Sequence, residues 1–183
     1  MKNVVNIFMC VRNNEDTLQK TFDGLNQIEI KNKKYDFRYY IYENDSTDNT
    51  KKIVINFFQY HKGSCLFETL NNTHWGNTRD SKRILDMSIY RNKMKNLCIN
   101  YNKSDYSIIL DTNITFQTTI FQEMSKIFEL NMNIEMVTPY GFVEDRPGLY
   151  YDTFALDIES EFLGNTLKKL QKEIQNNNIV NVK

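Results

Sequence analysis

Short apolar runs alternate along this chain with segments whose apolar residues recur every three or four positions. Four such runs predict strands, the third being the weakest: residues 4–11, 37–43, 64–70 and 106–110. Helical spacing follows each of the first three runs. Because a strand–helix–strand–helix order is typical of parallel βαβ units, we expect an α/β fold, with an open, mostly parallel, Rossmann-like sheet flanked by helices.

The expected helices are marked by the spacing of their apolar residues. The first two contain Leu18, Phe22 and Leu25, and then Ile53, Val54, Phe57 and Phe58. A long helix is expected over 79–102, where Met87, Tyr90, Met94, Leu97 and Tyr101 are spaced by three or four. Further along we expect a helix over 119–130, a fifth strand over 134–142, and a closing helix marked by Leu163, Leu167, Leu170 and Ile174. The chain of 183 residues is expected to form one domain over residues 1–183, with a frayed tail over about 175–183.

The composition argues against several classes of protein. Twenty-three basic and twenty-three acidic side chains cancel, so no global field favours nucleic acid or an anionic membrane. Three well-separated cysteines favour reduced thiols over a disulfide framework or a zinc site. The N-terminus is interpreted as a strand and not as a signal peptide, and no apolar run reaches the roughly 18 residues of a membrane span. We therefore expect a cytoplasmic protein.

A polar cluster follows the second predicted strand, in "YYIYENDSTDNT" over 39–50. Ser46 or Thr47 is expected to cap the next helix, and Asp48 to complement the helix dipole in its first turn. Glu43 is expected at the last strand position, pointing into the crevice beyond the sheet. There its carboxylate would accept hydrogen bonds from a base or a ribose, although a structural salt bridge is the alternative.

The predicted strand over 106–110 ends in a similar way, in "IILDTNITF". Asp111 and Asn113 place two oxygen-bearing side chains on one short turn, and such ligands suit Mg²⁺ or Mn²⁺ bridging to phosphates. The alternative is an ordinary turn, because Asp and Asn are common turn formers.

Two arginines accompany the apolar stripe of the long helix. Arg83 continues the stripe through 87, 90 and 94 at the start of the helix, and Arg91 flanks it. A guanidinium at such a place matches a diphosphate, with pairing to a protein carboxylate such as Glu43 or Asp111 as the alternative.

Taken in this order, the elements "CVRN", "YIYENDSTDNT", "RILDMSIYRN" and "IILDTNITF" resemble nucleotide-sugar glycosyltransferases of the GT-A fold over about residues 4–157. The resemblance is closest to the fungal capsule mannosyltransferase-like group and to glycosyltransferase domains of large DNA viruses. It also includes a later Tyr-Asp-Thr element, here residues 151–153.

The resemblance implies roles for individual residues. Val11, Arg12 and Glu43 would hold the nucleoside, while Asp111 and Asn113 would hold ribose, diphosphate and a Mn²⁺ or Mg²⁺ ion. Arg83 and Arg91 would absorb the charge of the diphosphate. The second acid of the family's D-x-D motif is Asn113 here, which puts dependence on a metal in doubt.

The implied reaction moves a sugar from a nucleotide-diphosphate sugar to a glycan or another hydroxyl acceptor, with inversion if a carboxylate takes the proton of the acceptor. Asp152 is the candidate base, with Asp145 and Glu144 as substitutes. The chain ends about 30 residues after Asp152, so an acceptor-binding region is expected to be missing or to belong to further domains of a longer polypeptide.

Two other functions remain open. A non-catalytic nucleotide- or carbohydrate-binding module with the same fold is favoured by Asn113 and by the short C-terminus. A nucleotidyltransferase ranks last, because "CVRNNEDT" contains no glycine. His61 and His74 are interpreted as surface residues, and Trp75 as a loop anchor or a platform for a sugar or base.

Overall fold

A computed structural model describes residues 2–71, 81–98, 103–130, 133–137, 142–143 and 146–150, the last two ranges as backbone only. The chain divides into two compact units, Met1–Glu123 and Met124–Lys183. Each unit is described by itself below. The expectation of one domain over the whole chain stays a prediction.

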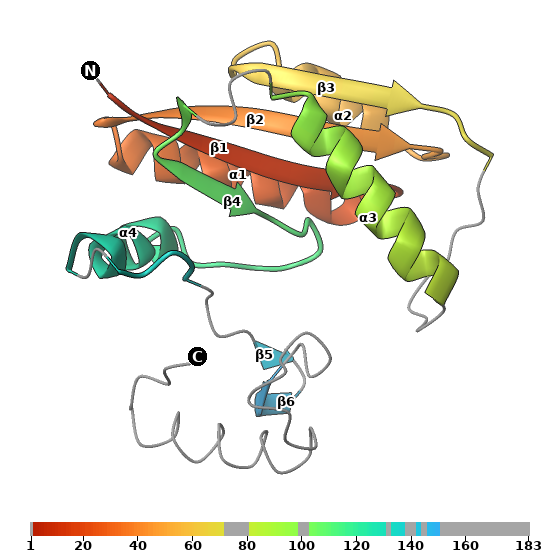
Figure 1. The fold of residues 1–183 in the computed structure, drawn as a ribbon. Coiled ribbons are helices and arrows are strands. Elements are labelled where there is room, and N and C mark those ends of the chain that lie inside the picture. The colour runs from red at the N-terminus through yellow and green to blue at the C-terminus, as the bar shows by residue number, and fades with distance from the viewer. Residues whose placement is uncertain are drawn as a thin grey trace. The chain divides into compact units, whose positions relative to one another are not determined.

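The first unit is built on a four-stranded sheet in which every pair is parallel (Figure 1). Its strands are β1 (Asn3–Val11), β2 (Tyr35–Asn44), β3 (Gly63–Glu68) and β4 (Tyr106–Ile109), in the spatial order β3-β2-β1-β4. The four strands expected from the sequence are therefore confirmed, each within a few residues of its expected bounds. β1 and β2 are each paired on both sides, so these two strands form the centre of the sheet.

Among the described residues, three helices lie on the two faces of this sheet: α1 (Glu15–Lys31), α2 (Thr50–Phe57) and α3 (Ser81–Asn96). A fourth, α4 (Ile120–Leu130), begins in the first unit and continues into the second. α1 and α2 cover one face, and α3 crosses the other face (Figure 1). The strand order explains this division. The chain first moves outward from β1 through β2 to β3, and α1 and α2 connect these strands on one face. It then returns past β1 to β4, and because crossovers are right-handed, α3 in this reverse connection lies on the opposite face.

Side chains of β1 alternate between the two faces. Val5, Ile7, Met9 and Val11 join the large core against α1 and α2, while Phe8 and Cys10 join a smaller cluster against α3. The larger core contains many aromatic contacts, such as the stacked rings of Phe22 and Phe57, whose centroids lie 3.9 Å apart. The predicted apolar stripes of α1 and α2 are confirmed by the burial of Leu18 and Val54.

Among the described residues, the bounds predicted for two elements of the fold were wrong. The helix expected over 79–102 ends at Asn96, although Tyr90 and Met94 of its stripe are buried as expected. Residues 134–137 form no strand, although a fifth strand was expected over 134–142. A short apolar run does not by itself distinguish a strand from other structure.

The second unit contains a separate antiparallel pair of strands, β5 (Phe142–Val143) and β6 (Arg146–Tyr150). The expected closing helix, marked by Leu163 and Ile174, lies outside the described residues, as does the tail expected to fray.

Candidate functional site

The strand order creates a switch point between β1 and β4, where the direction of winding reverses. In open α/β sheets, ligands bind outside the carboxyl ends of the strands at such a point, because the flanking loops turn away in opposite directions. The loops that carry Arg12 and Asp111 follow β1 and β4. The structure therefore places these two predicted site residues on either side of the switch point.

Asn13 and Asn14 organise the loop after β1. The Asn13 backbone N–H donates to Ser46 Oγ (3.0 Å), and its side-chain Oδ1 accepts the Thr47 N–H (2.8 Å). Asn14 Oδ1 accepts the Arg12 N–H (3.0 Å) and the Thr112 hydroxyl (3.1 Å). These two side chains thus join the loop after β1 to the loops after β2 and β4.

Neither asparagine was recognised from the sequence as part of the site. The available signal was a pair of consecutive asparagines directly after an apolar strand, which indicates a turn with side-chain hydrogen bonds. A turn prediction does not identify the loops that those side chains contact.

The polar cluster after β2 mainly joins loops. The expectation that Ser46 or Thr47 caps α2 was wrong, because the helix begins at Thr50 and its N-cap is Asn49. The expectation for Asp48 was partly wrong, because Asp48 precedes the helix instead of lying in its first turn. Its Oδ1 accepts the Thr50 N–H (2.9 Å) and its Oδ2 accepts the Glu15 N–H (3.0 Å). Burial alone would raise the pKa of the Asp48 carboxyl, but these hydrogen bonds outweigh it and hold that pKa below its ordinary value.

Glu43 lies one residue before the end of β2, and its side chain is fully buried. The expectation that it points into the crevice from the last strand position was therefore wrong. Oε1 accepts the Ser46 N–H (2.8 Å), and Oε2 lies 3.7 Å from Lys51 Nζ. Among the described residues, Oε2 has no hydrogen-bond partner. Glu43 pairs in register with Val11, so the two residues expected to hold a nucleoside are neighbours across β1 and β2.

Asp111 and Asn113 are exposed on the turn after β4, whereas Thr112 between them is buried. Thr112 anchors the turn, because its carbonyl accepts the Thr21 hydroxyl (3.2 Å) from α1 and its own hydroxyl donates to Asn14. Alternating exposure along this turn presents both predicted ligand side chains to solvent.

Arg91 and Asp111 are brought together by the structure. Arg91 Nη2 lies 3.9 Å from Asp111 Oδ1, and the two side chains are 50% and 62% exposed. This is the carboxylate pairing that the sequence left open as the alternative for an arginine of this helix. An exposed ion pair contributes at most about 1 kcal/mol, so both groups remain available to a ligand.

Cys10 lies close to this ion pair, on the α3 side of β1, where its thiol contacts Met94 Sδ (3.7 Å). The pKa of the Cys10 thiol is raised to about 12, chiefly by burial; Arg91 opposes this shift and Asp111 adds to it. The thiol therefore stays protonated at neutral pH, as a small apolar neighbour of the ion pair.

A second ion pair lies on the other flank of α3. Lys93 Nζ contacts Glu68 Oε2 at the end of β3, and the same oxygen accepts the Tyr42 hydroxyl (2.5 Å). Hydrogen bonds from Lys93 and Tyr42 lower the pKa of the Glu68 carboxyl, while burial and Glu68 raise the pKa of Tyr42. Arg91 pairs with the turn after β4, and Lys93 pairs with the end of β3. The two ion pairs therefore attach α3 to both edge strands of the sheet.

The other predicted site residues are placed less completely. Arg83 is partly exposed in the first turn of α3. Arg12 is mostly buried, with its Nη1 4.0 Å from Asp45 Oδ2. Asp152, Asp145 and Glu144 lie outside the described residues, as do His74 and Trp75.

The chemistry of the turn after β4 fits a hard cation that keeps most of its ligands from phosphate and water. Asp111 supplies a carboxylate and Asn113 an amide oxygen, and both are exposed. In the part of the chain that the structure describes, no group of three or more His, Cys, Asp or Glu residues forms a metal cage. The residues therefore fit a cation shared with a bound diphosphate and do not fit a closed all-protein site.

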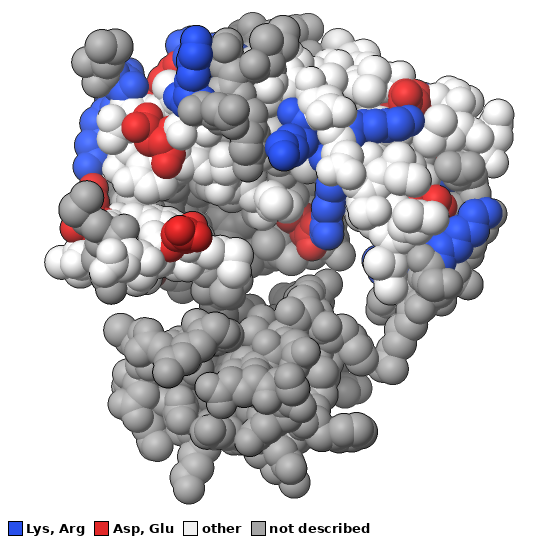
Figure 2. Space-filling view, viewed as in Figure 1, with Lys and Arg blue, Asp and Glu red and all other residues white. Residues whose placement is uncertain are grey.

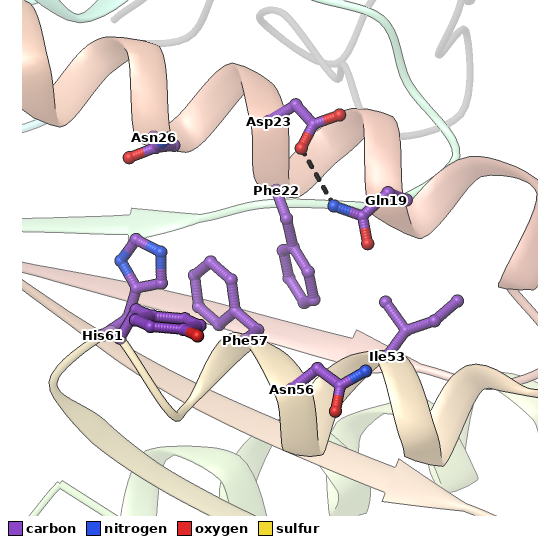
Figure 3. Close-up of a pocket in the computed structure, with 9 residues that line it drawn as sticks. Gln19, Phe22, Asp23, Asn26, Ile53, Asn56, Phe57 and His61 are labelled. Atoms are coloured by element: carbon purple, nitrogen blue, oxygen red, sulfur yellow. Dashed lines mark hydrogen bonds between the residues drawn. The ribbon is translucent and has the colours of Figure 1, made fainter.

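A shallow groove between α1 and α2 lies on the other face of the sheet (Figure 3). It encloses about 210 Å³, with Phe22 and Phe57 at its floor and polar side chains such as Asn26 and Asn56 along its rim. None of the predicted site residues lines it.

His61 also borders this groove. It follows the end of α2, as expected for a loop or helix-end residue, but the expectation that it lies on the surface was partly wrong. Its side chain is only 12% exposed, its Nδ1 lies 3.1 Å from Glu29 Oε1, and its ring stacks on Phe57 at 4.0 Å. Tyr39 donates its hydroxyl to the same Glu29 oxygen (2.5 Å). His61 therefore belongs to the packing between α2 and the sheet.

Charged side chains are interspersed on the described part of the α3 face, without a large patch of one sign (Figure 2). This matches the formal net charge of zero. Among the described residues, no helix combines the length and the apolar character that crossing a bilayer requires.

The first part of the chain matches a family of known proteins. No curated protein matches the chain, so the closer resemblance to the fungal capsule group and to viral glycosyltransferase domains stays a prediction. The family match covers residues 6–81, which include Val11, Arg12 and Glu43 and end before Arg83 and Asp111. The matching model is that of glycosyl transferase family 2, and the match supports a glycosyltransferase domain with the GT-A fold in this chain.

Proposed function

We propose that this chain transfers a sugar from a nucleotide-diphosphate sugar to a hydroxyl acceptor, with inversion at the anomeric carbon. The observation that carries the proposal is the meeting of Arg91 and Asp111 at the switch point of the sheet, 3.9 Å apart and both exposed. A guanidinium and a carboxylate at this place offer one group for a diphosphate and one for a ribose or a shared cation. The match to glycosyl transferase family 2 supports glycosyl transfer in general.

The nucleoside is assigned to the ends of β1 and β2. Val11 and Glu43 are paired neighbours there, and Arg12 follows directly. In this proposal Glu43 acts from beneath the loop, since it is buried and holds the Ser46 N–H. Arg83 and Arg91 of α3 face the diphosphate.

The reaction is a displacement at the anomeric carbon. The acceptor oxygen forms a bond to that carbon as the bond from carbon to the diphosphate oxygen breaks, and the nucleoside diphosphate leaves with the bonding electron pair. We assign the proton of the acceptor hydroxyl to the carboxylate of Asp152. The two arginines stabilise the negative charge that develops on the leaving group. Asp111 and Asn113 would hold Mn²⁺ or Mg²⁺, whose chemistry would be to neutralise part of that charge.

The direct test is to measure binding of UDP- and GDP-sugars by thermal shift, with and without Mn²⁺, and to follow release of the free sugar. A transferase is expected to bind one class of nucleotide sugar and to hydrolyse it slowly in the absence of an acceptor. Glu43→Gln keeps the volume and an oxygen for the Ser46 N–H, so the chain should stay folded. It loses the negative charge that the proposal places beneath the nucleoside and beside Lys51, so it should weaken nucleotide binding. Unchanged affinity in that variant removes Glu43 from the site.

One observation favours a second function, a non-catalytic module that binds a nucleotide or a carbohydrate. Asn113 supplies a neutral oxygen where a metal-dependent transferase of this fold would have an acid, so the turn holds one carboxylate only. Such a module would bind the nucleotide sugar and leave it intact. Donor hydrolysis above the rate in buffer rules the module out.

A further inference from the structure

We propose that Asp45 is a positioning residue of the donor site: its carboxylate fixes the loops after β1, β2 and β3 in the arrangement that binds the nucleotide. This inference rests on the proposed function, and it adds a residue that the family resemblance did not assign. It starts from the backbone at the carboxyl edge of the sheet. Among the described residues, three other than glycine have a positive φ there: Asn13 (50°), Asp45 (55°) and Asn71 (53°).

Each of these residues lies a short distance after a different strand of the same edge, namely β1, β2 and β3. The left-handed backbone conformation is unfavourable for residues other than glycine, and among these residues Asn and Asp tolerate it best. Strained residues persist only where surrounding contacts hold them, and they are frequent at ligand sites. Three of them along one edge require contacts that fix the loops.

Asp45 supplies several of these contacts. Its Oδ1 accepts the N–H groups of Leu70 (2.7 Å) and Asn71 (3.0 Å), which belong to the loop after β3. Its Oδ2 accepts Asn44 Nδ2 (3.1 Å) and lies 4.0 Å from Arg12 Nη1 in the loop after β1. The Asp45 side chain is only 8% exposed. One mostly buried carboxylate in the loop after β2 therefore contacts the loops after β1 and β3 and the end of β2 itself.

Asp45 contacts two loops that border the parts of the chain assigned to the nucleotide. Arg12 belongs to the loop assigned to the nucleoside, and Asn71 is the last described residue before the segment that leads to α3 and Arg83. Hydrogen bonds from backbone N–H groups to a carboxylate are charge-assisted, and losing the acceptor leaves the donors unsatisfied. Removing the carboxylate should therefore release the loop after β3 and the guanidinium of Arg12, while the core beneath stays packed.

Two variants of Asp45 separate positioning from simple stability. Asp45→Gly accepts a positive φ without strain but loses every side-chain contact. Asp45→Asn keeps an oxygen for the two N–H groups and loses the charge that faces Arg12. The matched control is Asp105→Gly at the opposite edge of the sheet, where Asp105 Oδ2 accepts the Val4 N–H (2.7 Å).

The measurements are the dissociation constants for UDP and GDP by calorimetry, with the melting temperature of each preparation. We expect Asp45→Gly to weaken binding of the preferred nucleotide at least tenfold, Asp45→Asn to weaken it less, and Asp105→Gly to leave it within twofold of wild type. Hydrogen exchange should show faster exchange of the Leu70 and Asn71 amides in Asp45→Gly only.

Failure of the positioning role can be distinguished from failure of the proposed function. A folded Asp45→Gly chain that binds the nucleotide as wild type does overturns the positioning role alone. Equal losses of affinity in Asp45→Gly and Asp105→Gly, in proportion to lowered melting temperatures, reduce Asp45 to a stabilising residue and also overturn it. A wild-type chain that binds neither UDP nor GDP overturns the proposed function, and the positioning role falls with it.

Discussion

Arg91 and Asp111 form an exposed ion pair, although the proposed function assigns them to different parts of the donor. Their 3.9 Å separation means that each group partly neutralises the other in the free protein. On donor binding, the guanidinium would turn to the diphosphate and the carboxylate to the ribose or to a cation. Since an exposed pair of this kind is weak, the exchange of partners costs little.

The first prediction concerns Arg91. Arg91→Gln should weaken UDP or GDP binding by about tenfold or more, because hydrogen bonds to a charged group contribute about 1.5–3 kcal/mol. The melting temperature should change little, since the lost ion pair is exposed. Calorimetry measures the affinity, and Lys52→Gln on exposed α2 surface is the control for loss of one positive charge. Equal effects of the two variants would assign the loss to net charge and not to Arg91.

The second prediction concerns Asp111 and Asn113. If they hold a cation, a chelator should lower the affinity for the nucleotide sugar, and Asn113→Asp should keep or strengthen Mn²⁺ binding. Asp111→Asn should weaken it, since the turn then has no carboxylate. Mn²⁺ titration in the presence of the nucleotide, followed by electron paramagnetic resonance, measures these changes. Nucleotide binding that is insensitive to the chelator would assign the diphosphate charge to the arginines alone.

The third prediction uses Cys10 as a probe of the same place. Its thiol has a pKa of about 12, raised from 9.0 chiefly by burial. At pH 8 its thiolate fraction should be about a thousandfold below that of an ordinary cysteine, so alkylation by iodoacetamide should be correspondingly slow. The pKa of this thiol is higher in the folded state than in the unfolded state, so its ionisation does not affect the free energy of unfolding below about pH 9. As the pH rises from there toward 12, the thiol ionises only in the unfolded chain, and the free energy of unfolding falls.

A substitution tests the electrostatics around Cys10. Asp111 raises the thiol pKa, so Asp111→Asn should lower it and speed alkylation of Cys10. Cys65, on β3, serves as the internal control, and mass spectrometry separates the two sites. Equal acceleration at both cysteines would point to a loosened fold and would contradict the proximity of Asp111 to Cys10.

The fourth prediction concerns the start of β3. Gly63 has a φ of 139°, and a Cβ atom there would lie 1.8 Å from the carbonyl oxygen of Tyr39. Gly63→Ala should therefore lower the free energy of unfolding by at least about 2 kcal/mol, measured by urea denaturation. Gly24→Ala is the matched control, because its Cβ would meet the Phe116 ring at 3.1 Å, and a side chain can move where backbone cannot. A smaller loss of unfolding free energy in Gly63→Ala than in Gly24→Ala would contradict the close approach of Gly63 to the Tyr39 backbone.

The fifth prediction concerns Asp152 as the base. Asp152→Asn should lower the rate of transfer by roughly 10² to 10⁴ while leaving nucleotide affinity nearly intact, because the amide keeps the shape but cannot take the proton. Transfer rate, donor affinity and melting temperature are measured on one preparation. A structural aspartate would lose stability and affinity together with the rate. Wild-type turnover would move the role to Asp145 or Glu144.

The sheet was predictable from the sequence because its strands are short apolar runs that alternate with segments of helical spacing. β1 and β2 carry apolar side chains on both faces, and the helices that follow have clear stripes. The loops were less predictable. Ser46 and Thr47 have the composition of helix caps, yet they bond to Asn13, from which they are separated by more than thirty residues in the sequence. Local propensity does not predict such partners, because they depend on which loops the strand order brings together.

Glu43 shows the same limit inside a strand. Its place at the end of an apolar run indicated a side chain facing the crevice, but the chain continues as a strand through Asn44 and Glu43 is buried beneath its own loop. In contrast, the exposure of Asp111 and Asn113 followed from their alternation around Thr112. The Arg91 pair was among the alternatives that the sequence left open, and only the path of α3 across the sheet selected it.

The position of β1 between β2 and β4 also has a consequence for how the protein is made. β1, β2 and β3 are consecutive in the chain, whereas the hydrogen bond between Val4 and Asp105, at the start of the β1–β4 pairing, joins residues 101 positions apart. Pairings between distant residues close large loops and form slowly. A growing chain therefore exposes one edge of its central strand until β4 has been synthesised, and the half of the crevice that carries Asp111 is the last part to assemble.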